Sequence, residues 1–259
     1  MSPAAARGLT AMELRLFPVA RVDAGAAYFA PGRAADVLAR YRTWIDRAPD
    51  ELSTAVRMLR VPHAPGVPAA VRGRRVLALV AMTTLDPAQA ERHLAPLRAA
   101  AGPALHDGLR PVRFADAAMG GVAPRRLDLV TGLPDAAIAA VVAAGETASV
   151  EVRHWGGAMA RPGRDAGPAG HRAVPLSVIA DADVPGLGAA LAPVATGGSF
   201  LNFLADPARV DSAFTPANLR RLRTVKRAYD PDDVFRLGAH VAPEPAGAHG
   251  VDRPLRWEA

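Results

Sequence analysis

The chain has 259 residues and half of them are apolar, so it is long enough to bury one large core or two small ones. It contains no cysteine, which excludes disulfides, zinc–thiolate sites and thiol nucleophiles. The formal net charge is +6, but Lys226 is the only lysine and the arginines are scattered along the whole chain, a pattern that does not favour nucleic-acid binding.

The sequence predicts neither a secretory signal nor a membrane span. Residues 1–10 lack the charged start and the apolar run of a secretory signal. No window reaches the roughly 18 apolar residues that a membrane span needs. We therefore expect a cytoplasmic protein with no membrane partner, in which residues 1–10 and 246–259 are flexible.

The first part of the chain predicts strands that flank a helix. Alternating apolar residues predict a strand over residues 12–20, with a short partner over 26–30. Between Pro31 and Arg47, apolar residues recur at helical spacing and predict a helix.

The same order then repeats. Patterns typical of strands cover residues 52–61 and 74–82, and a long segment rich in proline and glycine joins them. Asp86 and Pro87 supply an N-cap and a first-turn proline for a helix that ends near Gly102.

The middle of the chain is poorer in helices. A loose segment over residues 109–124 precedes the next elements, and a crossover rich in glycine and proline over 181–198 follows them. The predicted elements between them are strands over 126–133, 149–154 and 171–180 and a helix over 135–144. Many strands, few helices and no strict βαβ spacing predict an α+β fold, with a mainly antiparallel sheet and helices packed on one face.

The C-terminal part changes character. Residues 200–204 predict a short apolar strand, and Thr215 begins a helix that Asp230 and Pro231 end. We expect a substrate-binding-like α+β domain over residues 11–198 and a separate C-terminal segment over 199–245. No internal repeat is visible in the sequence.

Three motifs follow one another in the C-terminal segment: SFLNFL at 199–204, NLRRL at 218–222 and VKRAYDPDDVF at 225–235. Their order and spacing resemble the C-terminal signature of the berberine-bridge-enzyme-like family of FAD-linked oxidoreductases. Two further stretches agree with this resemblance, ELRLFPV at 13–19 and HWGGAMAR at 154–161. The resemblance covers most of the chain, thinly in the middle and densely at the end.

The resemblance implies the substrate domain and C-terminal segment of such an enzyme, without the flavin-binding domain. No glycine-rich loop stands between a strand and a helix, where it could hold the flavin pyrophosphate through backbone N–H groups. We therefore expect FAD only with a separately encoded flavin domain, and no cofactor in the isolated chain. The expected partners are that domain or further copies of the chain, and a small-molecule substrate.

The resemblance also assigns candidate site residues. It places seven of them near the substrate: His154, Gly156, Gly157, Arg161, His171, Arg172 and Phe200. It places Asn202 against the flavin. A purely structural interpretation stays open: a strand-end turn for the glycines, a hydrogen-bonded histidine at a sheet edge for His171, and an amide that satisfies backbone groups for Asn202.

Two departures from the family pattern leave the catalytic residues unknown. Some relatives carry glutamate where Arg161 stands, and many carry tyrosine where Phe200 stands. Arginine stays protonated and phenylalanine has no proton to exchange, so neither residue can act as an acid or base. Lys226 and Tyr229 are interpreted as parts of a packed amphipathic helix with a solvated lysine, and the histidines show no metal-ligand spacing.

Three hypotheses about function remain. The chain is one half of a split FAD-dependent oxidoreductase that acts on a small organic or secondary-metabolite substrate, a flavin-free ligand-binding or cyclase-like protein, or a truncated fragment. The first predicts an exposed apolar surface along Leu219, Leu222, Val225 and Phe235, because in the family this segment packs onto the flavin domain. The second needs only a concave pocket with a few polar groups.

Overall fold

The computed structural model describes residues 13, 16, 18–19, 21–163, 166–204, 206–237 and 240–243. The chain divides into two compact units. The sheet unit comprises 19–160 and 174–197, and the C-terminal unit comprises 1–18, 161–173 and 198–259. The strand predicted over 12–20 lies largely outside the described residues, and both predicted flexible ends lie wholly outside them.

The sheet unit is built on one eight-stranded sheet in which every strand pair is antiparallel. The spatial order is β4-β1-β3-β2-β7-β8-β6, and β5 also pairs with β1. The strands are β1 (Arg21–Phe29), β2 (Leu52–Arg60), β3 (Arg75–Thr83), β4 (Ala104–Asp107), β5 (Arg110–Arg113), β6 (Arg126–Val130), β7 (Val150–His154) and β8 (Leu176–Ala180).

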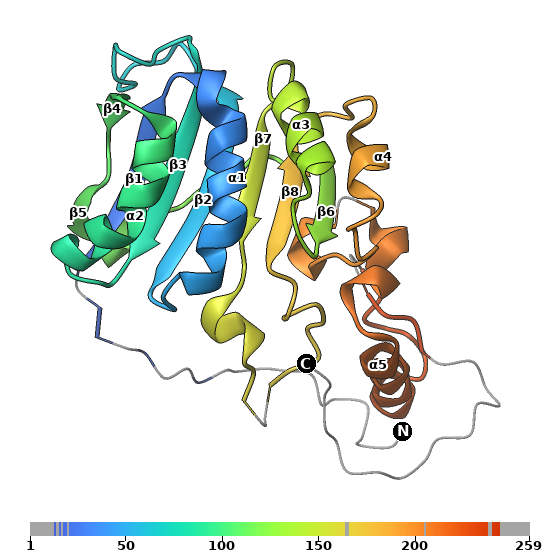
Figure 1. The fold of residues 1–259 in the computed structure, drawn as a ribbon. Coiled ribbons are helices and arrows are strands. Elements are labelled where there is room, and N and C mark those ends of the chain that lie inside the picture. The colour runs from blue at the N-terminus through green and yellow to red at the C-terminus, as the bar shows by residue number, and fades with distance from the viewer. Residues whose placement is uncertain are drawn as a thin grey trace. The chain divides into compact units, whose positions relative to one another are not determined.

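Helices cover one face of this sheet (Figure 1). They are α1 (Ala34–Trp44), α2 (Pro87–Ala101), α3 (Asp135–Ala144) and α4 (Leu187–Leu191). The unit also contains the short 3-10 helices η2 (Pro31–Arg33), η3 (Ile45–Arg47), η4 (Phe114–Asp116) and η5 (Gly157–Ala160). The predicted α+β class with a mainly antiparallel sheet is therefore confirmed. Within the described part of the chain, no helix has the length and apolar character needed to cross a membrane.

The core lies between the helices and the sheet. Every second residue of a strand faces the helices, so Val56 of β2 and Val152 of β7 meet the apolar side of α1. That side of α1 includes Val37, Leu38 and Tyr41, all fully buried. The Tyr41 hydroxyl is paired with the Thr54 hydroxyl at 2.9 Å, which satisfies a polar group deep in the core.

Local chemistry explains why most elements match the prediction. The predicted helices over residues 86–102 and 135–144 correspond to α2 and α3, and that over 31–47 corresponds to η2, α1 and η3. At the start of α2, the Asp86 carboxylate accepts a hydrogen bond from the backbone N–H of Gln89 at 3.0 Å, as an N-cap should.

Two predictions for the sheet unit were wrong because pairing overrides weak local patterns. The segment over 109–124, expected to be loose, contains β5, whose residues pair with the start of β1. The short strand β4 was not predicted either, since its four residues carry no clear alternation. The crossover over 181–198 contains the short helix α4.

Two predicted strands need correction near the C-terminal unit. The strand expected over 171–180 begins only at Leu176, since His171 has a left-handed backbone (φ 61°) that a strand does not accommodate. The strand expected over 200–204 is instead the 3-10 helix η6 (Leu201–Phe203). The remaining elements of this unit are η7 (Pro207–Ala213) and α5 (Pro216–Tyr229), whose N-cap Thr215 was predicted.

The N-cap of α2 gives a direct test of this local chemistry. Replacing Asp86 by alanine leaves the Gln89 N–H without its acceptor and should lower the free energy of unfolding by about 1 kcal/mol. Urea denaturation of the whole chain measures this. Gln89→Ala is the control, because it keeps the backbone donor and should change stability by less than about 0.5 kcal/mol. Equal losses in both variants would contradict the capping role.

Candidate functional site

A cavity of about 240 Å³ lies in the sheet unit where β7 ends. One side is formed by Arg153, His154 and Trp155 together with the Gly156–Gly157 turn. The rest is formed by Met119, by Ala158 and Met159 after the turn, and by residues of the 49–53 segment, which contains the start of β2. Three of the residues predicted to bind substrate, His154, Gly156 and Gly157, therefore line one concave site.

The two glycines are required by close approaches in this turn. A Cβ on Gly156 would lie 2.5 Å from Nε2 of His154, so the imidazole rests directly against the backbone. Gly157 has φ +67°, and a Cβ there would lie 3.1 Å from Oδ1 of Asp50. The turn therefore accepts only small residues, which agrees with either a structural or a ligand-binding role.

His154 is half-buried at the end of β7. Burial lowers the pKa of its imidazole below the ordinary value of 6.5, and the negative charge of Asp46 opposes this shift. The ring is therefore uncharged at neutral pH. A neutral imidazole has one nitrogen that can accept a hydrogen bond or a proton from a ligand.

A buried ion cluster lies behind this cavity, on the sheet face opposite the helices. Glu151 is fully buried and pairs with Arg57, directly opposite it on β2, and with Nε of Arg153 at 2.6 Å. Both arginine side chains are only 14% exposed. They also donate to the carbonyls of Met119 (2.7 Å) and Gly120 (2.6 Å), so the segment before β6 closes over the cluster.

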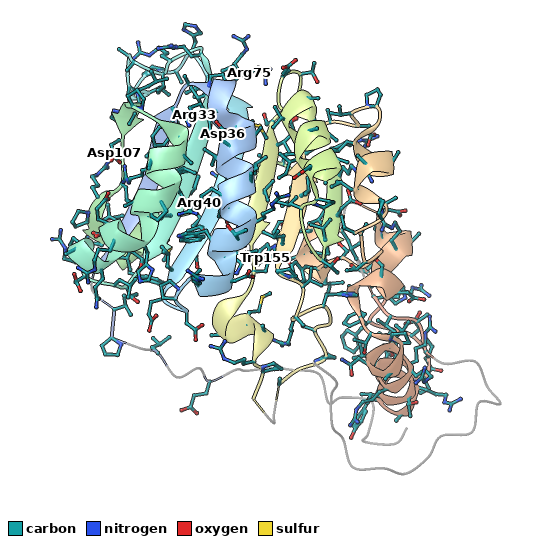
Figure 2. All side chains as sticks on the ribbon, viewed as in Figure 1. Arg33, Asp36, Arg40, Arg75, Asp107 and Trp155 are labelled. Atoms are coloured by element: carbon teal, nitrogen blue, oxygen red, sulfur yellow. The ribbon has the colours of Figure 1, made fainter. Side chains whose placement is uncertain are left out.

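Trp155 connects this cluster to the cavity wall (Figure 2). Its indole N–H donates to the Ser177 hydroxyl of β8 at 2.8 Å, and its backbone N–H donates to the carbonyl of Pro175 at 2.8 Å. The guanidinium carbon of Arg153 lies 5.5 Å from its ring centroid, a cation–π geometry. The wall is therefore held in place before any ligand arrives.

Five predicted residues belong to the C-terminal unit instead: Arg161, His171, Arg172, Phe200 and Asn202. His171 is hydrogen-bonded to the Ser212 carbonyl at 2.8 Å, so the expected hydrogen bond exists, although it is not at a sheet edge. Gly198 allows this arrangement, because a Cβ there would meet the imidazole at 2.3 Å.

The other four predicted residues of this unit have varied surroundings. Arg172 donates to the Ala169 carbonyl at 3.2 Å. The Phe200 ring lies 6.4 Å from that of Phe203. Arg161 and Asn202 are exposed, so the idea that Asn202 satisfies backbone groups at a strand end is wrong, since η6 replaces that strand. Roles of these residues in binding substrate or flavin stay predictions.

The turn after α5 is held by an internal ion cluster. Lys226 pairs with Asp230, with Asp233 at 2.8 Å and with the Phe235 carbonyl at 2.8 Å. Asp230 also accepts the backbone N–H groups of Val234 and Phe235, and the hydrogen bond from Lys226 lowers the pKa of its carboxyl to about 2. The expectation of a solvated lysine was wrong, because the Lys226 side chain is only 15% exposed.

An apolar cavity of about 480 Å³ adjoins this turn. Leu222 and Val225 of α5 line it together with Phe235. Phe235 is 67% exposed and Leu237 is 95% exposed, which is unusual for large apolar side chains. The exposed apolar surface predicted for this segment is therefore present at Phe235, whereas Leu222 and Val225 are half-buried, as is Leu219.

The sequence contains a signal for the ion cluster that the predictions above do not use. Arg57 and Glu151 are charged residues inside otherwise apolar strand patterns, and a charge at such a position needs a partner when it is buried. Their pairing depends on strands separated by more than ninety positions, which no local pattern reveals. In the described residues no group of histidines and carboxylates is arranged to bind a metal ion.

Comparisons with known proteins agree with these features. A sequence model of the family described as "Berberine and berberine like" matches residues 199–240. A search of curated proteins finds no relative. Among solved structures, 6-hydroxy-D-nicotine oxidase from Arthrobacter nicotinovorans is similar with a TM-score of 0.60 and 19% identity, covering 87% of this chain and 56% of that one.

Two further solved structures are similar. Berberine bridge enzyme from Eschscholzia californica has a TM-score of 0.65 at 14% identity, over 89% of this chain and 57% of that one. Xylooligosaccharide oxidase from Myceliophthora thermophila C1 has a TM-score of 0.58 at 15% identity. The chain thus has the fold of about half of a berberine-bridge-like oxidoreductase, and the resemblance inferred from the sequence is confirmed.

The buried ion cluster should be costly to break. Glu151→Gln leaves two largely buried guanidinium groups without their carboxylate and should lower the free energy of unfolding by about 3–5 kcal/mol. Urea denaturation measures the loss. Glu146→Gln is the matched control, because Glu146 is exposed just before β7 and its replacement should cost less than about 0.5 kcal/mol. A mild effect of Glu151→Gln would contradict the cluster.

His154 should make stability depend on pH. Because its folded pKa lies below 6.5, the unfolded chain binds more protons between the two values, so stability rises with pH through that window. Melting temperatures measured between about pH 5 and about pH 7.5 should therefore increase with pH. His154→Gln should reduce this slope, and an unchanged slope in that variant would show that other groups cause it.

Proposed function

We propose that the chain is the substrate-domain and C-terminal half of an FAD-dependent oxidoreductase of the berberine-bridge-like type, acting on a small organic or secondary-metabolite substrate with a separately supplied flavin domain. The observation that carries this proposal is coverage: nearly 90% of the chain matches just over half of each similar oxidoreductase. A match this extensive supports a role for the chain within such an enzyme.

The described residues do not by themselves fit FAD. A flavin pyrophosphate needs several backbone N–H groups at a glycine-rich turn that opens a helix. None of the described connections from a strand to an α-helix is rich in glycine; that between β1 and α1, for example, contains Pro31, which has no N–H, and a single glycine, Gly32. FAD binding in this proposal therefore depends on the partner domain, and no catalytic step is assigned to the flavin here.

What the chain supplies is a place for the substrate. The cavity at the end of β7 has a fixed aromatic wall in Trp155, an uncharged imidazole in His154 and a turn that exposes backbone at Gly156 and Gly157. Its volume of about 240 Å³ lies below the range of roughly 300–1,000 Å³ that is typical of small-molecule sites, so it suits part of a substrate. His154 can accept a hydrogen bond or proton from a substrate hydroxyl or amine.

The C-terminal unit supplies a surface on which a flavin domain can dock. Tyr229, Val234, Phe235 and Leu237 are all exposed and lie at the end of α5 and in the turn that follows it. The Lys226 ion cluster fixes this turn, so the apolar groups are presented by a rigid backbone. A partner that buries them would gain free energy from removing apolar surface from water.

A second candidate function is supported by Arg161 and Phe200. Neither residue can exchange a proton, although the family pattern has glutamate and tyrosine there. A flavin-free ligand-binding protein needs the cavity at the end of β7 and no acid or base, so these two residues favour such a descendant. Flavin binding in the presence of a partner discriminates between the two functions.

The test is a titration with FAD followed by flavin fluorescence. The folded chain alone should not change the fluorescence of FAD. The chain mixed with a flavin domain encoded beside it should bind FAD stoichiometrically. Phe235→Asp should weaken assembly, because it places a charge in the apolar surface. Phe114→Asp is the control, since Phe114 is also exposed but belongs to the sheet unit.

Each outcome decides the proposal. FAD binding only in the mixture, lost in Phe235→Asp and kept in Phe114→Asp, supports a split oxidoreductase. A folded chain that forms no FAD complex with any such domain contradicts it and leaves the ligand-binding alternative.

A further inference from the structure

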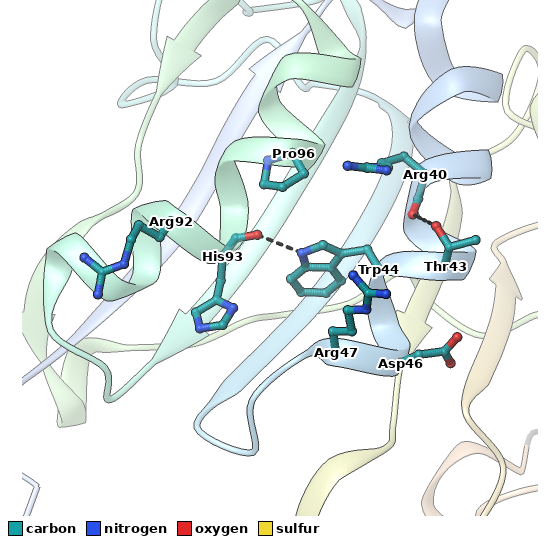
Figure 3. Close-up of a pocket in the computed structure, with 8 residues that line it drawn as sticks. All are labelled: Arg40, Thr43, Trp44, Asp46, Arg47, Arg92, His93 and Pro96. Atoms are coloured by element: carbon teal, nitrogen blue, oxygen red, sulfur yellow. Dashed lines mark hydrogen bonds between the residues drawn. The ribbon is translucent and has the colours of Figure 1, made fainter.

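A cavity of about 700 Å³ lies between α1 and α2, on the helix-covered side of the sheet (Figure 3). Residues of α1, η3 and α2 line it, and none of them belongs to the Gly156–Gly157 turn or to the C-terminal unit. Its volume lies within the range of about 300–1,000 Å³ that is typical of small-molecule sites. The cavity is thus a second concave site, separate from the one at the end of β7.

The arginines of this region fall into two groups. Those outside the cavity are ion-paired with carboxylates: Arg33, Arg42 and Arg98. Those that line the cavity have no carboxylate partner among the residues that the structure describes: Arg40, Arg47 and Arg92. Figure 2 shows the contrast along one helix, with Arg33 beside Asp36 near the start of α1 and Arg40 further along it.

The lining therefore has an excess of positive charge. Asp46 is the one carboxylate among the lining residues, and Figure 3 shows it turned away from Trp44. The lining contains three guanidinium groups and one carboxylate, so its net charge is about +2. Arg40 and Arg47 lie beside Trp44 in this view, whereas Arg92 points away from it.

The floor of the cavity is fixed before any ligand binds. Trp44 is only 9% exposed, and its indole N–H donates to the His93 carbonyl at 2.7 Å. Its ring stacks on that of Tyr41, with 5.8 Å between the ring centroids and 14° between the ring planes. Because the indole donor is already used, Trp44 offers a ligand only apolar contact, and the positively charged donors of the lining are the arginines.

We propose that this cavity binds a small organic dianion, with its oxyanion group held by Arg40 and Arg47 and its body against Trp44. A guanidinium presents a planar fork of N–H donors that matches carboxylate and phosphate oxygens bidentately. Two negative charges match the uncompensated charge of the lining. The proposal is independent of the oxidoreductase function, since it involves neither the cavity at the end of β7 nor the flavin partner.

Calorimetric titration of the whole chain at constant ionic strength tests this. The probes are phenyl phosphate and phthalate, and the neutral control is dimethyl phthalate. One dianion should bind per chain and the neutral ester should not. Arg40→Gln and Arg47→Gln should each weaken binding by about tenfold or more, the usual loss of a charged hydrogen bond. Arg110→Gln removes an exposed charge from β5, outside the cavity, and should leave the affinity for the dianion unchanged.

The outcomes are distinct. Binding of phenyl phosphate alone identifies a phosphate-ester site, and binding of phthalate alone identifies a dicarboxylate site. Absence of binding by both probes overturns the proposal. An equal loss in Arg110→Gln and Arg47→Gln also overturns it, because the effect would then come from net charge. Arg40 and Arg47 are exposed, so the melting temperatures of their variants should stay unchanged and an unfolded variant would be recognised.

Discussion

The pairing of β2 with β7 holds the sheet unit together. In the strand order, β1 to β5 lie next to one another in one half of the sheet, and β6 to β8 form the other half. The two halves are joined where residues 55–58 of β2 pair with residues 150–153 of β7. On the helix side Val56 meets Val152, and on the opposite side Arg57 meets Glu151. The segment between β2 and β7 becomes a long closed loop when these two strands pair, and closing it costs conformational entropy. The buried apolar contacts and the ion cluster between the strands must offset this cost.

The position of the candidate substrate site follows from this pairing. The ladder between β2 and β7 ends at Ala55 and Arg153, whereas β7 stays paired with β8 through His154, so β2 and β7 separate from this point on. His154 and the glycines occupy the opening, and the 49–53 segment, which contains the start of β2, closes its other side. The site is therefore placed by strands that are rigid because they lie in the middle of the sheet.

The C-terminal unit shows how a sequence signature can have a local structural cause. Within the VKRAYDPDDVF motif, Lys226 and Asp230 form an ion pair, and Asp230 holds two backbone N–H groups of the turn. The charged groups therefore bond within the turn itself, and the Phe235 side chain stays exposed. The motif thus leaves a large apolar side chain exposed beside a turn that its own charged groups hold.

The sequence by itself determined what depends on neighbours along the chain. The periodicity of residues 34–44 and the caps at Asp86 and Thr215 specified the helices, and the order of strands predicted an antiparallel sheet with helices on one face. Local pattern was enough because caps and helical periods act over three or four residues.

The tertiary structure alone decided what depends on distant partners: the pairing of β5, the loss of strand at 171–175 and 200–204, and the contacts of Arg57, Glu151 and Lys226. It also separated the predicted site residues between two units and brought arginines of α1, η3 and α2 around one cavity. Such juxtapositions come from strand register and helix packing, which a one-dimensional pattern does not contain.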